Sequence, residues 1–288
     1  MQDLSRRSFV TKSLALGGGM AAALSLSNSK LAATPRAVED DISLAQWALV
    51  REIREGQWTT LDFPRVARED FGLNGIEFVN TLFDVPTSRY LGQLKENADD
   101  NDVKMILIMV DAEGETCTPS RGERKQTVIN HRKWIDIAQY LGCSAIRTNC
   151  RGPENPPRDE SVKWAAETYN MMLEHAIPAG ISILIENHGG VSNDPDWMAD
   201  LMKEVDSLYF GSYPDWRSPS DNFDNYSYLK KMLPWAGGMS YRNQPTEEGT
   251  AKLINLCRES GYRGWYGIES SGREEIAKGR DLLKKYLF

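Results

Sequence analysis

The chain has 288 residues, of which 41% are hydrophobic and 26% are charged, and its formal net charge is −7. This composition excludes a disordered chain and suits one large α/β domain or two ordinary domains. The acidic balance argues against a nucleic-acid partner, because binding to a phosphate backbone requires a basic excess that displaces counterions.

The N-terminal segment has the features of an export signal. Arg6 and Arg7 precede a weakly apolar run, residues 14–26, that three glycines loosen and that is too short to span a bilayer as a mature helix. We expect residues 1–33 to be a twin-arginine signal peptide read by the Tat export machinery, and residues 34–41 to be a linker. Cleavage would leave a periplasmic protein without a stable membrane anchor. An uncleaved anchor is the alternative, which the glycines and serines disfavour.

Short apolar runs alternate with amphipathic stretches along the rest of the chain. Strands are expected at residues 42–47, 76–79, 103–110, 144–149, 181–186, 208–212, 235–241 and 264–269. Helices are expected at residues 61–71, 88–100, 120–141, 159–177, from 194 onward, 222–232, 246–260 and 271–287. This alternation predicts a (β/α)8 barrel over residues 42–288. An open doubly wound sheet is the alternative, but it would be favoured by a glycine-rich phosphate loop after the first strand, and none is present.

The fifth expected strand ends in Glu186, Asn187 and His188, followed by Gly189 and Gly190. Polar groups at the end of a buried strand are costly unless they face a cleft, a metal or each other. In a (β/α)8 barrel, active sites are built at the C-terminal ends of the strands. The alternative is a Glu186 that faces a helix and pairs with a neighbouring arginine.

Charged residues also end other strands of the predicted barrel. Asp215 and Glu269 would face Glu186 across the mouth, and three carboxylates at close range require a cation or shared protons between them. Hard oxygen ligands select Mg²⁺, Mn²⁺ or Ca²⁺. A divalent metal bound by these three carboxylates is therefore expected.

The sequence Glu-Asn-His-Gly-Gly at residues 186–190 resembles the end of a strand in the xylose isomerase-like TIM-barrel superfamily, the sugar phosphate isomerase/epimerase group. The resemblance extends from about residue 42 onward. It implies a divalent ion, Mn²⁺ or Mg²⁺, held by Glu, Asp, His and Glu from strands five to eight. Glu186, Asp215 and Glu269 match three of these positions, but strand seven has no histidine. Water, Ser240 or a more distant group would complete the shell, or Arg242 would replace the charge of the metal.

Proton abstraction next to a carbonyl suits this set of residues. The resemblance assigns the acid and base roles to Glu186 and Glu269. His188 would bind a substrate hydroxyl or shuttle a proton, or else it would orient Glu186.

Further residues are candidates for substrate binding. Glu77 and Asp111 would bind sugar hydroxyls or form structural salt bridges. Arg147 and Arg242 would bind an anionic group or balance the carboxylates. Trp216 is a candidate for stacking on a sugar ring; Trp47 is a second one, although core filling is the favoured reading for it.

We therefore expect a periplasmic sugar isomerase or epimerase that acts on a sugar or keto-sugar through an enediolate. A 3-keto-glycoside lyase or hydratase on the same barrel would begin with the same proton transfer. A carbohydrate-binding barrel without catalysis is the alternative from another class, which the missing histidine would permit. The expected partners are a small carbohydrate and, in a homo-oligomer, further copies of the chain.

Overall fold

The structure is a computed structural model that describes residues 42–217 and 222–287. The signal peptide and linker expected at residues 1–33 and 34–41 lie outside the described residues, so both stay predictions. Within the described ranges, no helix is both long and apolar enough to cross a membrane.

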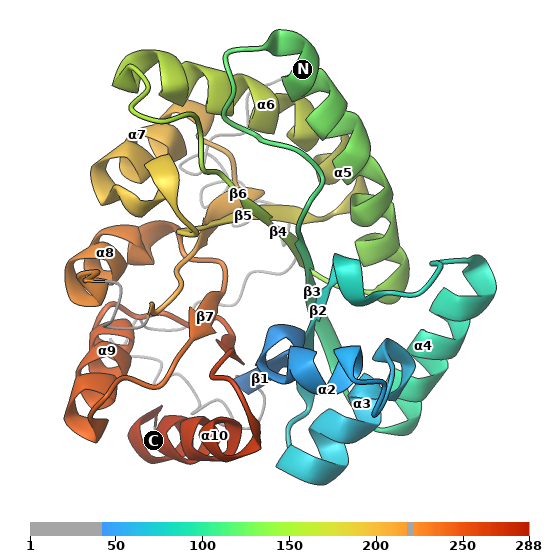
Figure 1. The fold of residues 1–288 in the computed structure, drawn as a ribbon. Helices are drawn as coiled ribbons and strands as arrows, with labels where there is room; N and C mark the ends of the chain where they lie inside the picture. Colours follow the sequence, from blue (N-terminus) through green and yellow to red (C-terminus); the bar gives the residue numbers. More distant parts are fainter. Residues whose placement is uncertain (1–41, 218–221, 288) are drawn as a thin grey trace, which may run out of the picture.

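Eight parallel strands form the centre of the molecule (Figure 1). They are β1 Ile42–Ala45, β2 Gly75–Val79, β3 Lys104–Val110, β4 Ala145–Asn149, β5 Ser182–Glu186, β6 Phe210–Tyr213, β7 Met239–Tyr241 and β8 Tyr266–Ile268. Their order in the sheet is β6-β5-β4-β3-β2-β1-β8-β7. Parallel bridges between Ser212 and Ala236 and between Asp215 and Ser240 join the two outermost strands. The sheet thereby closes on itself, which confirms the predicted (β/α)8 barrel.

The helices form a ring around the strands (Figure 1). The α-helices are α2 Val50–Arg54, α3 Phe63–Arg65, α4 Ser88–Asp100, α5 Arg121–Leu141, α6 Arg158–Ala179, α7 Pro195–Val205, α8 Asn225–Met232, α9 Glu247–Glu259 and α10 Arg273–Leu287. Shorter 3-10 or π turns are η2 Gln46–Leu49, η3 Thr60–Asp62, η4 Val66–Asp70, η5 Asn80–Leu82, η6 Gly190–Asn193 and η8 Leu233–Trp235. Several helices begin at caps that the sequence indicates. Ser120, for example, accepts a hydrogen bond from the Glu123 amide at the start of α5.

The segment after β1 differs from the prediction. The strand expected at residues 42–47 ends at Ala45, and the chain turns at once into η2 and α2. The side chain of Gln46 explains the turn, because its amide nitrogen donates to Thr60 Oγ1 at 2.8 Å and its oxygen accepts from the Val79 amide at 2.9 Å. This early turn brings Trp47 and Arg54 to the mouth of the barrel.

The barrel has an inner and an outer core. The outer core lies between strands and helices, whereas a small inner cluster contains residues such as Val79, Leu184 and Tyr213. Side chains two positions apart on a strand point to the same face. Glu186 therefore follows Leu184 on the inner face, and Asp215 follows Tyr213. The inner apolar layer thus ends in a polar layer at the C-terminal mouth.

Candidate active site

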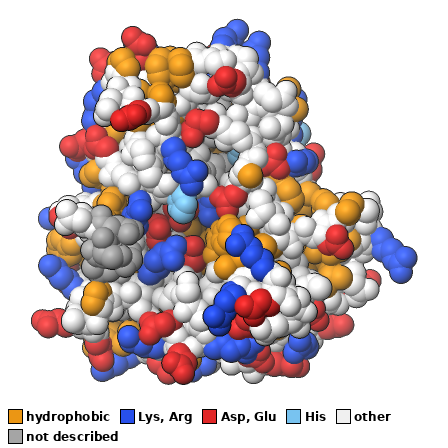
Figure 2. Space-filling view, in the orientation of Figure 1, with side chains coloured by type: hydrophobic (Ala, Val, Ile, Leu, Met, Phe, Trp, Pro, Cys, Tyr) orange, Lys and Arg blue, Asp and Glu red, His pale blue; other side chains and the backbone are white. Residues whose placement is uncertain are grey.

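A cleft of about 630 Å³ opens at the C-terminal ends of the strands. Its lining includes Asp111 after β3, Arg147 in β4, His188 after β5, Arg242 after β7 and Glu269 after β8. Figure 2 shows a hollow near the centre of this face, where acidic, basic and histidine side chains meet.

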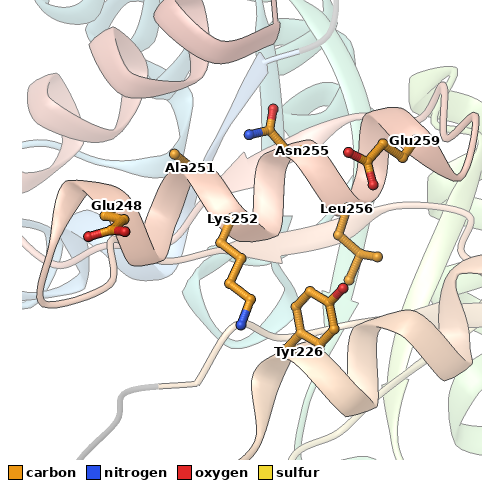
Figure 3. A pocket seen from close by; sticks show the side chains of 7 residues that line it. All are labelled: Tyr226, Glu248, Ala251, Lys252, Asn255, Leu256 and Glu259. Atoms are coloured by element: carbon orange, nitrogen blue, oxygen red, sulfur yellow. The ribbon is translucent and has the colours of Figure 1, made fainter.

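A second hollow, of about 360 Å³, lies between α8 and α9 in the outer ring (Figure 3). Lys252 of α9 lies 4.4 Å from the ring centroid of Tyr226 of α8 there. The buried carboxyl groups gather at the barrel mouth instead, so the cleft is the candidate active site.

Arg147 organises one side of the cleft. Its Nη1 donates to Asp111 Oδ1 at 2.7 Å, and its Nε lies 3.0 Å from Glu186 Oε2. Asp111 also accepts from Asn149 Nδ2 at 2.6 Å and from Trp47 Nε1 at 3.3 Å. Burial raises the pKa of Asp111, but Arg147 and Asn149 outweigh it and leave that pKa lowered. Asp111 is therefore an ionised partner of Arg147 that also faces the cleft.

Arg242 organises the other side. Its Nε donates to Asp215 Oδ1 at 2.8 Å, and its Nη2 donates to Glu269 Oε1 at 2.7 Å. Ser240 donates to the second carboxylate oxygen of Glu269 at 2.5 Å. The guanidinium thus joins the ends of β6 and β8. Ser240 and Arg242 are the residues that strand seven supplies where the resemblance implies a histidine.

Glu186, His188 and Asp215 form a group that can hold a metal ion. One ligand atom from each lies within 4.8 Å of the others. The Glu186 carboxylate is fully buried, and neither of its oxygens accepts a hydrogen bond, because the nearby Arg147 Nε is close but poorly aligned. A buried carboxylate that accepts no hydrogen bond can be stabilised by a bound cation. His188 is suited to bind one, since burial, Arg147 and Arg151 lower its pKa and favour the neutral ring.

This group differs from the predicted ligand set of Glu186, Asp215 and Glu269. Glu269 is outside it, and Arg242 and Ser240 donate to its two carboxylate oxygens. His188 takes its place, with Nδ1 3.7 Å from Glu186 Oε2.

Two of the carboxyl groups titrate near neutral pH. Burial raises the pKa of Glu186 to about 7, with a further rise from Glu269 that Arg147 opposes. Burial also raises the pKa of Asp215 to about 7, and repulsion from Glu186 acts in the same direction. A group with such a pKa can both take up and release a proton at neutral pH.

The loop after β5 is fixed by its own side chains. Asn187 donates to the Asp215 carbonyl at 3.0 Å and accepts from the Asp215 amide at 2.7 Å, so it ties β5 to the end of β6. Gly190 has φ +58°, and a Cβ there would lie 1.9 Å from the Arg151 carbonyl oxygen. The asparagine and the glycines thus position the loop rather than take part in chemistry.

The structure places Glu77 away from the cleft. Its carboxylate is fully buried in the barrel, where Ser43 donates to one oxygen at 2.7 Å and Tyr213 donates to the other. The Cβ-free Gly267 leaves room beside it. The predicted contact of Glu77 with sugar hydroxyls is therefore replaced by a structural role.

The positions of the two tryptophans differ from the expectation. Trp216 is 1% exposed and packs against Tyr241 and Tyr266, with ring centroids 5.0 and 6.3 Å away, so its predicted stacking on sugar is wrong. Trp47 lines the cleft instead. Core filling was the favoured expectation for it, with stacking on a sugar as the alternative.

The lining residues that the sequence reasoning missed include Arg54, Asn149 and Arg151. Asn149 ends the fourth expected strand, so the rule of polar strand ends would have found it. Arg54 and Arg151 lie in connecting segments, where no periodic pattern marks them.

Comparison with known proteins identifies the family of this chain. Residues 65–286 match the xylose isomerase-like TIM barrel family. The chain belongs to that family. A comparison with curated proteins gives no match.

Solved structures of this family's fold resemble the chain closely in shape and weakly in sequence. A D-tagatose 3-epimerase-like protein has a TM-score of 0.69 and 16% identity, over 86% of this chain and 97% of its own. A sugar phosphate isomerase/epimerase from Parabacteroides distasonis has a TM-score of 0.66 and 16% identity, over 90% and 98%. The 3-keto-D-glucoside 4-epimerase from E. coli has a TM-score of 0.63 and 13% identity, over 79% and 94%. At these identities the likeness concerns the fold.

Proposed function

We propose that the chain is a sugar isomerase or epimerase that abstracts a proton next to a carbonyl group. The observation that carries this proposal is the pair of glutamates at one mouth, with Glu186 at the end of β5 and Glu269 after β8. These strands are three apart in the ring, and the cleft opens at their C-terminal ends. The epimerase names of the similar structures support the same class.

The two glutamates have different surroundings that suit an acid and a base. Glu186 is buried without a hydrogen-bond donor, and its pKa is raised to about 7. Glu269 is held by Ser240 and Arg242 and faces the cleft. One would remove the α-proton and the other would return it. The guanidinium of Arg242 would stabilise negative charge that develops on the substrate oxygen.

A divalent metal, Mn²⁺ or Mg²⁺, is part of the proposal. Glu186, His188 and Asp215 would hold it, since their ligand atoms converge and the Glu186 oxygens accept no hydrogen bond from the described residues. When bound, such an ion supplies Lewis-acid stabilisation of the substrate oxygen.

The keto-sugar alternative retains support. The chain shares its fold with the 3-keto-D-glucoside 4-epimerase, and elimination from a 3-keto-glycoside would begin with the same proton transfer. We also propose periplasmic action, because we expect Arg6 and Arg7 to belong to an export signal. A periplasmic site favours sugars that are available outside the cytoplasm.

Two measurements on the purified protein test the proposal. Elemental analysis without chelator, or after Mn²⁺ addition, should give one divalent ion per chain. Mass spectrometry of sugars and keto-sugars incubated in D₂O should show deuterium at the carbon next to the carbonyl. If no sugar or keto-sugar exchanges that proton, the chain is a carbohydrate-binding barrel and the proposal fails.

A further inference from the structure

Two arginines of the cleft differ from the other two in their partners. Arg147 and Arg242 each pair with two carboxylates. Arg54 and Arg151 are exposed, line the same cleft, and form no ion pair with any residue in the described ranges. Their charges are therefore available to a ligand.

Arg151 is held in place by the loop after β5. Its amide donates to Glu115 Oε1 at 3.2 Å, its carbonyl accepts from the Val191 amide at 2.8 Å, and its Nε donates to the His188 carbonyl at 3.1 Å. A Cβ on Gly189 would touch its side chain. These contacts use the backbone and Nε, and no hydrogen bond from either Nη group to a described residue is present. A guanidinium fixed in this way loses little entropy when it binds an anion.

Arg54 ends α2 and also lines the cleft. Its guanidinium carbon lies 5.5 Å from the ring centroid of Trp47, and Trp47 donates to Asp111 Oδ2. Asp111 already binds Arg147, so this ring is fixed to the inner network. The early turn after β1 thus presents both an aromatic face and a positive charge to the ligand.

All four carboxylates of the site, Asp111, Glu186, Asp215 and Glu269, pair with Arg147 or Arg242. Arg54 and Arg151 line the same cleft without a carboxylate partner among the described residues. Guanidinium groups can donate to neutral hydroxyls, but a carboxylate or phosphate binds them more strongly, through charge-assisted hydrogen bonds.

We propose that the substrate is a sugar derivative that carries an anionic group, a carboxylate or a phosphate, which Arg54 and Arg151 bind at the rim of the cleft. The inference rests on the proposed function, because the carbonyl end of the same sugar would lie at Glu186 and Glu269. Binding the anionic end at the rim sets which carbon faces the two glutamates.

The test compares three monosaccharides, each as the neutral sugar, the uronate and the monophosphate. Affinities are measured by titration calorimetry on the wild type, on Arg54→Gln with Arg151→Gln, and on Arg132→Gln, an exposed arginine of α5 outside the cleft. An anionic form should bind the wild type at least about tenfold more tightly than its neutral parent. The double variant should lose that preference and keep the neutral affinity, and Arg132→Gln should behave as the wild type. Uronates or monophosphates, whichever bind better, identify the group.

Three results would overturn the inference: neutral sugars that bind as tightly as their anionic forms, a preference that survives in the double variant, or no binding of any acid or phosphate. Deuterium exchange on the same sugars separates the two proposals. If neutral sugars exchange without an anionic preference, the proposed function stands and the rim site fails. If anions bind through the arginines but no sugar exchanges, the rim site stands and the proposed function fails.

Discussion

Three buried carboxyl groups, Glu77, Glu186 and Asp215, have pKa values raised to about 7, chiefly because burial disfavours their charged forms. Glu77 has two hydroxyl donors and no access to the cleft, whereas Glu186 has no donor and lies next to His188. A raised pKa alone therefore does not identify a catalytic residue. Both carboxylates are fully buried, so their hydrogen-bond donors and their neighbours distinguish them.

Glu77 should make stability depend on pH. Its pKa in the folded state, about 7, lies above its ordinary value of 4.5. Its contribution is therefore fully present below pH 4.5 and is lost as pH rises through 7, by about 3 kcal/mol. Glu77→Gln should lack this loss. The free energy of unfolding of the variant should therefore rise relative to that of the wild type as the pH increases from 5 to 8. Urea denaturation measures it, with the exposed Glu96→Gln as control; parallel profiles for all three proteins would contradict the assignment.

The different burial of Trp216 and Trp47 leads to a stability prediction. Trp216→Ala should lower the free energy of unfolding by about 3–5 kcal/mol, because it removes a fully buried ring from the core. Trp47→Ala should cost much less, since the ring is only partly buried, and should weaken ligand binding instead. Denaturant unfolding of both variants is the measurement. Similar losses of stability would show that Trp47 is a core residue after all.

At the scale of the element, the apolar runs predicted the strands and therefore also the polar residues that end them. The turn after β1 was not, because Gln46 forms it through hydrogen bonds to Thr60 and Val79, which lie 14 and 33 positions away. The pairing of Arg242 with Asp215 and Glu269 was also open in the sequence. A long side chain can select among several carboxylates, and only the assembled barrel brings these two to it.

The loop after β5 offers a matched pair of substitutions. Gly190→Ala places a Cβ 1.9 Å from the Arg151 carbonyl oxygen, whereas Gly180 has a similar positive φ, +72°, and nothing within 4 Å. Gly180→Ala should therefore cost only the left-handed backbone strain, about 1–2 kcal/mol. Gly190→Ala should cost clearly more and should also weaken binding of an anionic sugar, because Arg151 must move. Equal losses of stability, by thermal or urea unfolding, would show that this close approach is unimportant.

At the scale of the whole molecule, the β–α alternation predicted the closed barrel and therefore the side on which the site lies. Glu186, Asp215, Arg242 and Glu269 meet there as expected. The arginine pair at the rim was missed, because its members come from connecting segments whose course depends on tertiary contacts. The topology thus predicted the strand-end residues of the cleft, whereas the positions of Arg54 and Arg151 depend on the connecting segments.

The export prediction concerns residues outside the described ranges. Replacing Arg6 and Arg7 by lysine should leave the precursor in the cytoplasm, because twin-arginine recognition reads the guanidinium pair. Cell fractionation of a reporter fusion measures this. A variant that still reaches the periplasm by the same pathway would show that residues 1–33 are not such a signal.

The central claim is that Glu186 and Glu269 transfer the substrate proton, and Glu269→Gln tests it most directly. Turnover and ligand affinity are measured separately on a sugar that the wild type converts. Turnover should fall by about 10² to 10⁴, the usual contribution of a positioned acid or base, while affinity is retained because the other contacts lie elsewhere. Turnover near that of the wild type would make Glu269 a structural partner of Arg242 and would contradict the account.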